Sequence, residues 1–268
     1  MKLNMRGRTV LITGASSGIG RSLSRCFAED GARLVISSCH SDRAALEKWR
    51  SELGDLSGTS VTALTCDLST DQGPESLYIS AVEKAGEPDI LVNNAGIMAY
   101  GNFHQLPMDR QAALLHVNAA AYMKLMRLAL PGMIERGFGR VLNIVSVSAF
   151  QPCPHHAVYG ATKAFTQSLS EAVNSEIRGT GVRVLTFNPS YTDTPLLRVD
   201  GFPDKLWWYR VSGLGDPEKT AVIGYRAFLR DRQVYIPGII NRMVHTLVLR
   251  FIPRRVKAMI SELVLRGN

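Results

Sequence analysis

The sequence predicts one α/β domain in which helices cover both faces of a doubly wound, parallel, seven-stranded sheet. Seven short runs rich in β-branched residues alternate with longer segments that carry apolar residues at helical spacing. Such alternation is typical of parallel strands joined by helical crossovers. A chain of 268 residues, 46% of them hydrophobic, can bury one sizeable core but is short for two full domains.

The strands are expected at the seven β-branched runs. In chain order these are TVLIT (9–13), RLVIS (33–37), VTALT (61–65), DILVN (89–93), RVLNIVS (140–146), VRVLTF (182–187) and VYIPG (234–238). Long helices are expected at 110–136 and 157–178, where apolar residues recur at near-helical spacing. We divide the chain into a main unit at 1–240 and a basic amphipathic extension at 241–268, in which two short helices meet at Pro253.

Composition and charge narrow the classes of partner and location. The excess of 31 basic over 23 acidic residues favours anionic partners such as phosphorylated cofactors or acidic membrane surfaces. No nucleic-acid partner is expected, because no motif combines aromatic platforms with clustered arginines.

The four cysteines lack C-x-x-C spacing and are interpreted as reduced thiols: Cys26, Cys39, Cys66 and Cys153. We find no secretory signal and no run long enough to span a membrane, so a cytoplasmic protein is expected.

A glycine-rich turn follows the first predicted strand. TVLITGASSGIGRSL places three glycines between that strand and an amphipathic helix. Glycines let the backbone approach a pyrophosphate, and a helix N-terminus offers it free N–H groups and partial positive charge. A tight turn without a ligand is the simpler alternative, but the succession of strand, glycines and helix favours a dinucleotide site. The expected contacts are Gly14, Ser16, Ser17, Gly18, Ile19 and Gly20.

From residue 9 to about 195 the chain resembles the short-chain dehydrogenase/reductase family. Six motifs occur in family order: T-G-x-x-x-G-x-G at 13–20, an aspartate after the third strand at Asp67, N-N-A-G at 93–96, a helical asparagine at Asn118, a serine at Ser146 and Tyr-x-x-x-Lys at Tyr159 and Lys163. The resemblance implies a Rossmann-type fold, a homodimer or homotetramer, and NAD(P)-dependent oxidoreduction of a carbonyl or secondary alcohol. It also implies cofactor contacts at Asp67, Leu68, Asn94, Ala95 and Gly96.

Tyr159 and Lys163 lie four residues apart on one predicted helix and therefore share a face. A phenol with a pKa of about 10 is a poor base at neutral pH, and a nearby ammonium should lower that pKa. We expect Tyr159 to act as a general acid/base toward a substrate oxygen. By the resemblance, Lys163 also holds the nicotinamide ribose. A chance pairing is the alternative, which the matching positions of Ser146 and Asn118 disfavour.

Ser146 ends the fifth predicted strand at the edge of the sheet where open α/β folds bind ligands. Its hydroxyl is expected to stabilise developing charge on the substrate oxygen. Ser148 competes for this role, and the family's thirteen-residue spacing to Tyr159 selects Ser146. By the resemblance, Asn118 should hold a water that relays protons toward Lys163, whereas helical propensity alone would make it a solvated polar residue.

The end of the second predicted strand bears on the choice of cofactor. Enzymes that prefer NAD(H) usually carry an acid there, which accepts the ribose 2′-OH and repels a 2′-phosphate. Ser38 and Cys39 occupy these positions, so NADP(H) is favoured over NAD(H), with Arg43 or Arg21 near the phosphate.

The segment after the sixth predicted strand, PSYTDT, keeps most of a family motif but has Ser190 in place of glycine. By the resemblance, Pro189, Thr192 and Thr194 should contact the cofactor. The following segment should close over the substrate, and its apolar residues would suit a bulky, weakly polar molecule: Leu196, Leu197, Phe202, Trp207, Trp208 and Tyr209. Packing of these side chains against the core or a neighbouring subunit is the alternative.

The adjacent His155 and His156 have no acidic or cysteine partner nearby in sequence. No metal site is therefore expected, and both are interpreted as exposed loop residues that could touch substrate.

Two other functions stay open beside the enzyme that acts on a small carbonyl or alcohol. One is a cofactor-sensing binding protein without turnover, which the intact set of Ser146, Tyr159 and Lys163 disfavours. The other is a membrane-associated reductase of a lipid-like ketone, because the basic segment 241–268 could make peripheral contact with an anionic membrane surface. The same segment would equally serve to cap the pocket or pack on the domain.

Overall fold

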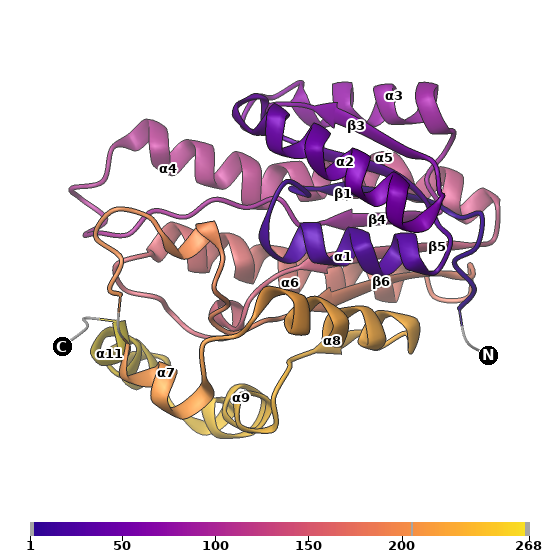
Figure 1. Cartoon of the computed structure of the whole chain (residues 1–268). Coiled ribbons are helices and arrows are strands. Elements are labelled where there is room, and N and C mark those ends of the chain that lie inside the picture. Colours follow the sequence, from indigo (N-terminus) through magenta and orange to yellow (C-terminus); the bar gives the residue numbers. More distant parts are fainter. Residues whose placement is uncertain (1–2, 205, 266–268) are drawn as a thin grey trace.

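The computed structural model describes residues 3–204 and 206–265, and within them a seven-stranded, all-parallel sheet is covered by helices on both faces (Figure 1). The strands are β1 Thr9–Thr13, β2 Arg33–Ser38, β3 Val61–Thr65, β4 Ile90–Asn93, β5 Gly139–Ile144, β6 Val182–Phe187 and β7 Val234–Tyr235. They lie in the order β3-β2-β1-β4-β5-β6-β7. The predicted fold class, a doubly wound Rossmann-type sheet, is confirmed.

The two faces of the sheet bury separate apolar clusters. Val10 and Ile12 of β1 pack into the cluster under α1 Gly18–Glu29, α2 Arg43–Ser57 and α8 Pro217–Leu229. The intervening Leu11 packs into the cluster under α3 Gly73–Ala85, α5 Ala121–Glu135 and α6 Ala157–Glu176. Successive side chains of a strand point to opposite faces, so an uninterrupted apolar strand requires helices on both sides.

The strand order reverses at β1, which has β2 on one side and β4 on the other. The chains that leave β1 and β4 therefore diverge at the carboxyl edge, the usual ligand site of such sheets. Hydrogen bonds hold the two departing loops together: the backbone N–H groups of Asn94 and Ala95 both donate to Thr13 Oγ1, at 3.0 Å each. The first glycine motif and the N-N-A-G motif thus meet at this edge.

The predicted long helices are present with shifted ends. The first runs from α4 Met108–Leu115 through a π-helical turn, His116–Ala120, into α5, and the second is α6. Strand β5 stops before Ser146, which instead caps a 3-10 turn, Val147–Phe150, by accepting the Ser148 N–H at 3.1 Å. The last strand is also shorter than its apolar run, because only its first two residues pair with β6.

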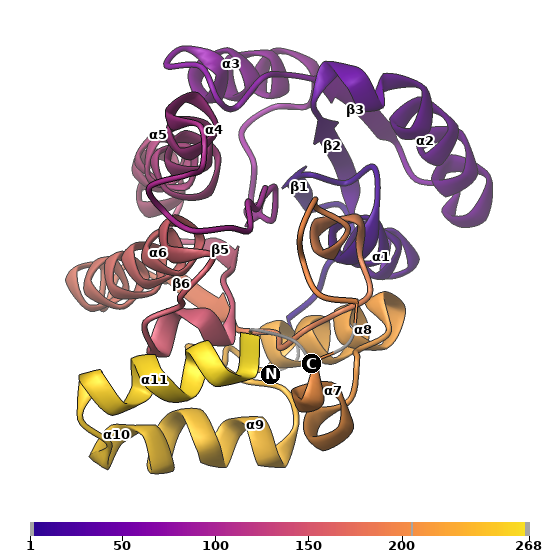
Figure 2. The ribbon, with the colours of Figure 1, turned by 90° about the vertical axis from the view of Figure 1, so that its left-hand side faces the viewer.

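The segment after β6 contains α7 Trp207–Ser212, α8 and β7, followed by two helices that Pro253 separates as predicted. The first comprises α9 Ile239–Met243, a π-helical turn Val244–Val248 and α10 Leu249–Phe251, and the second is α11 Arg254–Leu265. Figure 2 shows the helix from α9 to α10 running side by side with α11, next to α7. Residues 266–268 of the predicted extension lie outside the described part, and the division of the chain at residue 240 stays a prediction.

All four cysteines are free thiols. Within the described residues, no helix combines the length and the apolar character needed to cross a membrane.

Candidate active site

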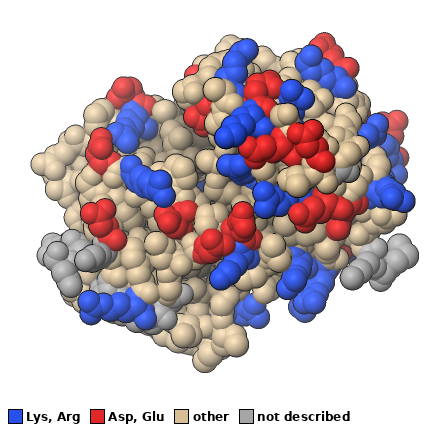
Figure 3. All heavy atoms as spheres, viewed as in Figure 1, with Lys and Arg blue, Asp and Glu red and all other residues tan. Residues whose placement is uncertain are grey.

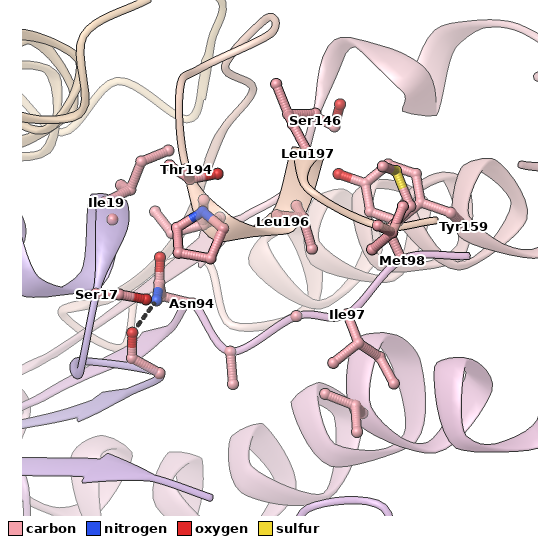
Figure 4. Close-up of a pocket in the computed structure, with 18 of the residues that line it drawn as sticks. Ser17, Ile19, Asn94, Ile97, Met98, Ser146, Tyr159, Thr194, Leu196 and Leu197 are labelled. Atoms are coloured by element: carbon pink, nitrogen blue, oxygen red, sulfur yellow. Dashed lines mark hydrogen bonds between the residues drawn. The ribbon is translucent and has the colours of Figure 1, made fainter. Parts of the chain in front are cut away.

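A cavity of about 650 Å³ opens at the carboxyl edge of the sheet and brings most of the predicted site residues together. In its wall lie Gly14, Ser16, Ser17, Gly18, Ile19, Ser38, Cys39, Asp67, Leu68, Asn94, Ala95, Gly96, Ser146, Tyr159, Lys163, Pro189, Thr192 and Thr194. Figure 4 places Ser17 and Asn94 toward one end and Ser146 and Tyr159 toward the other. Two predicted residues, Gly20 and Asn118, are not part of the wall.

The glycine turn fits a phosphate group. Gly14 and Gly18 have φ values of 66° and 54°, which side chains other than glycine rarely adopt. A Cβ on Gly18 would also lie 2.9 Å from Thr194 Cγ2 across the cavity. The capping residue of α1, Ser17, makes no side-chain hydrogen bond, and the first turn of α1 holds no acid. The first N–H groups of this helix therefore have no side-chain acceptor and can bind an anion.

Gly20 serves packing rather than the cavity. A Cβ at this position would overlap the Asn94 side chain and the carbonyl oxygen of Gly14. Asn94 Nδ2 in turn donates to the carbonyl oxygens of Thr13 and Gly14, at 2.9 Å each. The third glycine thus lets α1 approach the loop after β4, which stabilises the shape of the turn.

Asn118 is fully buried in the π-helical turn, and its side chain is hydrogen-bonded to one residue. Its Oδ1 accepts the Ile97 N–H at 2.9 Å, and its Nδ2 donates to the Ile97 carbonyl at 2.8 Å. Its own carbonyl accepts Thr166 Oγ1 at 3.1 Å. Asn118 therefore positions the loop that carries Gly96 and Ile97, while the water relay stays a prediction.

Tyr159 and Lys163 are both buried on one face of α6. Lys163 Nζ donates to the carbonyl of Ile144 at 3.0 Å and lies 5.6 Å from the centre of the Tyr159 ring. The hydroxyl of Tyr122 donates to the same Ile144 carbonyl at 3.3 Å. The ammonium is thus anchored to the end of β5, beside the phenol.

Burial shifts the pKa values of both groups. It raises the pKa of Tyr159 to about 12, with the Ser146 hydroxyl acting in the opposite direction. It lowers the pKa of Lys163 to about 7. The direction is therefore opposite to the expected lowering, because loss of hydration outweighs the hydrogen bond from Ser146. Near neutral pH the phenol is protonated and is a proton donor.

The serine that hydrogen-bonds the phenol is Ser146, although Ser148 also lines the cavity, and the role of Ser146 toward a substrate oxygen stays a prediction. The Ser148 backbone N–H donates to Ser146 Oγ and so fixes the orientation of that hydroxyl. The short turn after β5 therefore presents Ser146 to Tyr159 across the cavity.

The far end of the cavity is polar. Asp67 accepts the Ser69 N–H at 2.9 Å and the Ser69 hydroxyl at 2.6 Å, and these hydrogen bonds lower its pKa. Ser38 and Cys39, at the end of β2, also line this end, and neither carries an acidic side chain.

Sequence analysis missed a carboxylate at this polar end. Asp42 lines the cavity and accepts the Ser16 hydroxyl at 2.8 Å. The two arginines expected near a 2′-phosphate do not line the cavity: Arg43 donates to Thr65 Oγ1 and Arg21 to Glu52. Asp42 lies only four residues after Ser38, the last residue of β2. This closeness in sequence to the end of the strand could have indicated that Asp42 belongs to the site.

The end of the cavity beside Tyr159 is apolar. Five side chains from the loops after β4 and β6 line it: Met98, Leu196, Leu197, Val199 and Phe202. Trp208 and Tyr209 pack behind this wall rather than in it, with Tyr209 edge-on to Tyr191 at 5.4 Å. Of the segment predicted to close over the substrate, one part thus lines the cavity and another packs behind its wall. The side chain of Trp207 lies outside what the structure describes.

His156 lines the cavity and is only 3% exposed, so the expectation of an exposed loop residue is wrong. Its ring packs edge-on against Tyr159 at 5.8 Å and near Tyr100 at 6.5 Å. Burial lowers its pKa to about 4, so it is neutral at physiological pH. Its position three residues before Tyr159, on the same face of the helix, was the signal available in the sequence. In the described part of the chain, no cluster of three or more His, Cys, Asp or Glu residues could hold a metal ion.

A cavity that joins a glycine turn at a helix N-terminus to a buried phenol and amine, at the switch point of a doubly wound sheet, is typical of a nucleotide-dependent oxidoreductase. The chain belongs to the short chain dehydrogenase family, whose model matches residues 8–201.

Three similar proteins illustrate the membership. The 1-deoxy-11-beta-hydroxypentalenate dehydrogenase of Streptomyces exfoliatus is 33% identical over 199 residues, which cover 73% of this chain and 71% of that protein. A short-chain dehydrogenase from Sphingobium yanoikuyae in complex with NADPH has a TM-score of 0.78 and 31% identity, with 87% and 88% of the two chains covered. A 3-ketoacyl-(acyl-carrier-protein) reductase from Brucella melitensis complexed with NADH has a TM-score of 0.73 and 30% identity, with 84% and 91% covered. These two structures hold different nicotinamide cofactors.

Proposed function

We propose that this protein reduces a bulky, weakly polar ketone, or oxidises the matching secondary alcohol, with NADP(H) as the preferred cofactor and Tyr159 as the proton donor or acceptor. The observation that carries the proposal is that Ser146, Tyr159 and Lys163 share one cavity with the glycine turn. The rival reading, a sensor without turnover, gives no reason for these three side chains to face one space.

The residues present fit a nicotinamide dinucleotide. Gly14, Gly18 and the free N–H groups of α1 would hold the pyrophosphate, and Asp67 would lie beside the adenosine. Lys163 would hold the nicotinamide ribose, next to Gly96, where an added Cβ would lie 3.8 Å from Lys163 Nζ. When bound, the cofactor supplies or accepts the hydride.

Tyr159 and Ser146 act on the substrate oxygen. The protonated phenol donates its proton to the carbonyl oxygen and becomes a phenolate, while the Ser146 hydroxyl stabilises the charge that develops on that oxygen. In the opposite direction the phenolate takes the proton from the alcohol. Because burial raises the pKa of Tyr159 to about 12, the neutral-pH form of the protein is prepared for reduction.

The apolar half of the cavity favours a bulky substrate. Met98, Leu197 and Phe202 line it, and few polar side chains lie among them beside Tyr159, including Ser146 and the neutral His156. Mostly apolar walls with few polar groups are typical of sites for weakly polar ligands.

The preference for NADP(H) rests on Ser38 and Cys39, which carry no negative charge at the end of β2. Asp42 opposes a 2′-phosphate, although its carboxylate is engaged by Ser16. Fluorescence titration with NADPH and NADH tests the proposal, and a lower dissociation constant for NADH would refute it.

The proposed enzyme is tested by Tyr159→Phe. We expect turnover of a panel of aliphatic and aromatic ketones to fall by about a hundredfold or more, the usual contribution of a positioned acid. NADPH affinity should stay within about twofold, because the change removes one hydroxyl that the substrate uses. Phe103→Tyr, at an exposed side chain outside the cavity wall, is a matched control that should leave turnover unchanged. Equal turnover of wild type and Tyr159→Phe, or no turnover of any ketone or alcohol by wild type, would count against the enzyme.

We also propose a homodimer or homotetramer built on α5 and α6. Exposed apolar side chains on these helices support it, among them Met123 and Phe165, which are 42% and 44% exposed. Sedimentation equilibrium of wild type and Phe165→Ser tests the assembly, and a monomeric wild type would refute it.

A further inference from the structure

The helices after β7 have their apolar side chains on the outside. Ten large hydrophobic residues between 239 and 263 are exposed: Ile239, Ile240, Met243, Leu247, Val248, Phe251, Val256, Met259, Ile260 and Leu263. Phe251 is 83% exposed and Ile239 is 76% exposed. In α11 the exposed positions 256, 259, 260 and 263 follow helical spacing and define one apolar stripe. We call these ten side chains the outer apolar face.

The inward side of the same helices is partly polar, the reverse of an ordinary surface helix. Asn241, His245 and Ser261 are buried against the protein, at 7%, 8% and 3% exposure. Asn241, His245 and Leu249 recur every four residues, opposite the exposed Ile239, Met243 and Leu247. A segment that buries polar groups while it exposes this many large apolar side chains is typical of a contact face for another molecule or a membrane.

The charges on this segment select the partner. Residues 241–268 contain six basic residues and one acid. Arg254 and Arg255 are exposed at the start of α11, which carries part of the outer apolar face, whereas Arg242 donates to the Ile236 carbonyl. Along the lower margin of the molecule in Figure 3, where Figure 1 shows α9, the surface is tan and blue, and the red atoms lie above it. A second copy seated there about a two-fold axis would bring these cations against themselves, whereas anionic lipid headgroups would neutralise them.

The inner side of α11, opposite the outer apolar face, adjoins the apolar half of the cavity. Leu265, at the inner side of α11, packs in one cluster with Tyr159, Met98 and Phe202. The Tyr100 hydroxyl donates to the Leu265 carbonyl at 2.6 Å. A surface on which α9 to α11 rested would therefore lie across α11 from the wall that the proposed substrate contacts.

We propose that α9, α10 and α11 dock the protein on an anionic lipid surface, with the outer apolar face in the acyl boundary and the flanking arginines and lysine on the headgroups. The two helices lie along the surface rather than cross it. This inference goes beyond the proposed reaction and does not depend on it.

Vesicle flotation of the full chain tests the docking. We expect binding to vesicles of about 30% phosphatidylglycerol in phosphatidylcholine, and weaker binding to pure phosphatidylcholine. Phe251→Ser with Met259→Ser should lower the partition coefficient at least about tenfold, since insertion scales with buried apolar area. Arg254→Gln and Lys257→Gln should each lower it about fivefold, because one cation at an anionic surface contributes about 1 kcal/mol.

Matched controls are available on the opposite side of the molecule. Leu56→Ser with Ile79→Ser removes comparably exposed apolar side chains from α2 and α3, and Lys48→Gln removes an exposed cation from α2. None should change the partition coefficient. NADPH affinity, measured in every variant, reports whether the fold is intact and separates loss of docking from failure of the proposed function.

Three results would overturn the proposal. One is equal partitioning of the Phe251→Ser, Met259→Ser variant and the α2 and α3 control. Another is equal binding to neutral and anionic vesicles. The third is a wild-type dimer that binds no vesicles and dissociates when Phe251 and Met259 are changed, which would assign the outer apolar face to a second copy.

Discussion

A buried lysine beside the proposed acid makes the stability of this protein depend on pH in a specific way, which Lys163→Met tests. Burial lowers the Lys163 pKa from 10.5 to about 7. Between these values the unfolded chain binds a proton that the folded chain does not, so the free energy of unfolding rises with pH. At pH 7 the folded lysine is half protonated, so it costs the folded state about 4 kcal/mol, slightly less than the full shift of about 3.5 pH units at 1.36 kcal/mol each.

Lys163→Met removes the cost of the buried lysine and introduces the smaller cost of a lost hydrogen bond. Methionine carries no charge, and the lost hydrogen bond to the Ile144 carbonyl is worth about 1 kcal/mol. We therefore expect Lys163→Met to be more stable than wild type by about 3 kcal/mol at pH 7 and by only about 1 kcal/mol at pH 9. The decline of about 2 kcal/mol arises because wild type releases a proton from Lys163 when it folds, whereas the variant has no proton to release there.

Urea unfolding at equal protein concentration, at several pH values from about 7 to 9, measures this difference. Lys48→Met is the matched control, since the exposed Lys48 side chain is solvated in both states and should give a small difference that does not change with pH. A stability difference between Lys163→Met and wild type that is constant across this range would refute the reasoning, as would a variant less stable than wild type at pH 7.

Three further predictions concern residues that shape the cavity. In urea unfolding, Gly20→Ala should lower the free energy of unfolding by about 1–3 kcal/mol, because the added Cβ overlaps Asn94 and the Gly14 carbonyl. Gly54→Ala is the control and should be neutral or stabilising, because the space around its added Cβ is open. Asn118→Leu should lower the free energy of unfolding by about 1–3 kcal/mol in the same assay, because both hydrogen bonds to Ile97 are lost. The same loss should weaken NADPH binding, and an unchanged dissociation constant would contradict the positioning role. Asp42→Asn should lower the dissociation constant of NADPH relative to NADH by about fivefold, the effect of removing about 1 kcal/mol of like-charge repulsion, and an unchanged ratio would show that Asp42 does not face the 2′ position.

The sheet could be predicted because its information is local. Each strand is a β-branched run, and the three glycines mark the first turn whether or not a ligand binds there. The shared position of Tyr159 and Lys163 could be predicted for a similar reason, since a spacing of four residues on a helix places two side chains on one face.

The remaining features depend on contacts between segments far apart in sequence. Gly20 lies in a motif associated with the cofactor, yet its neighbour in space is Asn94. His156 reads as a loop residue until Tyr100 and Tyr159 pack around it. The direction of the Tyr159 pKa shift likewise needed the degree of burial, which the spacing of Tyr159 and Lys163 does not contain.

The hydrogen bond from Tyr100 to the Leu265 carbonyl joins residues 165 positions apart and bears on the order in which the molecule assembles. All seven strands precede α11 in the chain, so the sheet and its glycine turn can form before this helix docks. The apolar wall beside Tyr159 is complete only after docking, because Leu265 belongs to its cluster. The nucleotide half of the cavity should therefore mature first during folding, and α11 should detach at a lower free energy than the sheet unfolds.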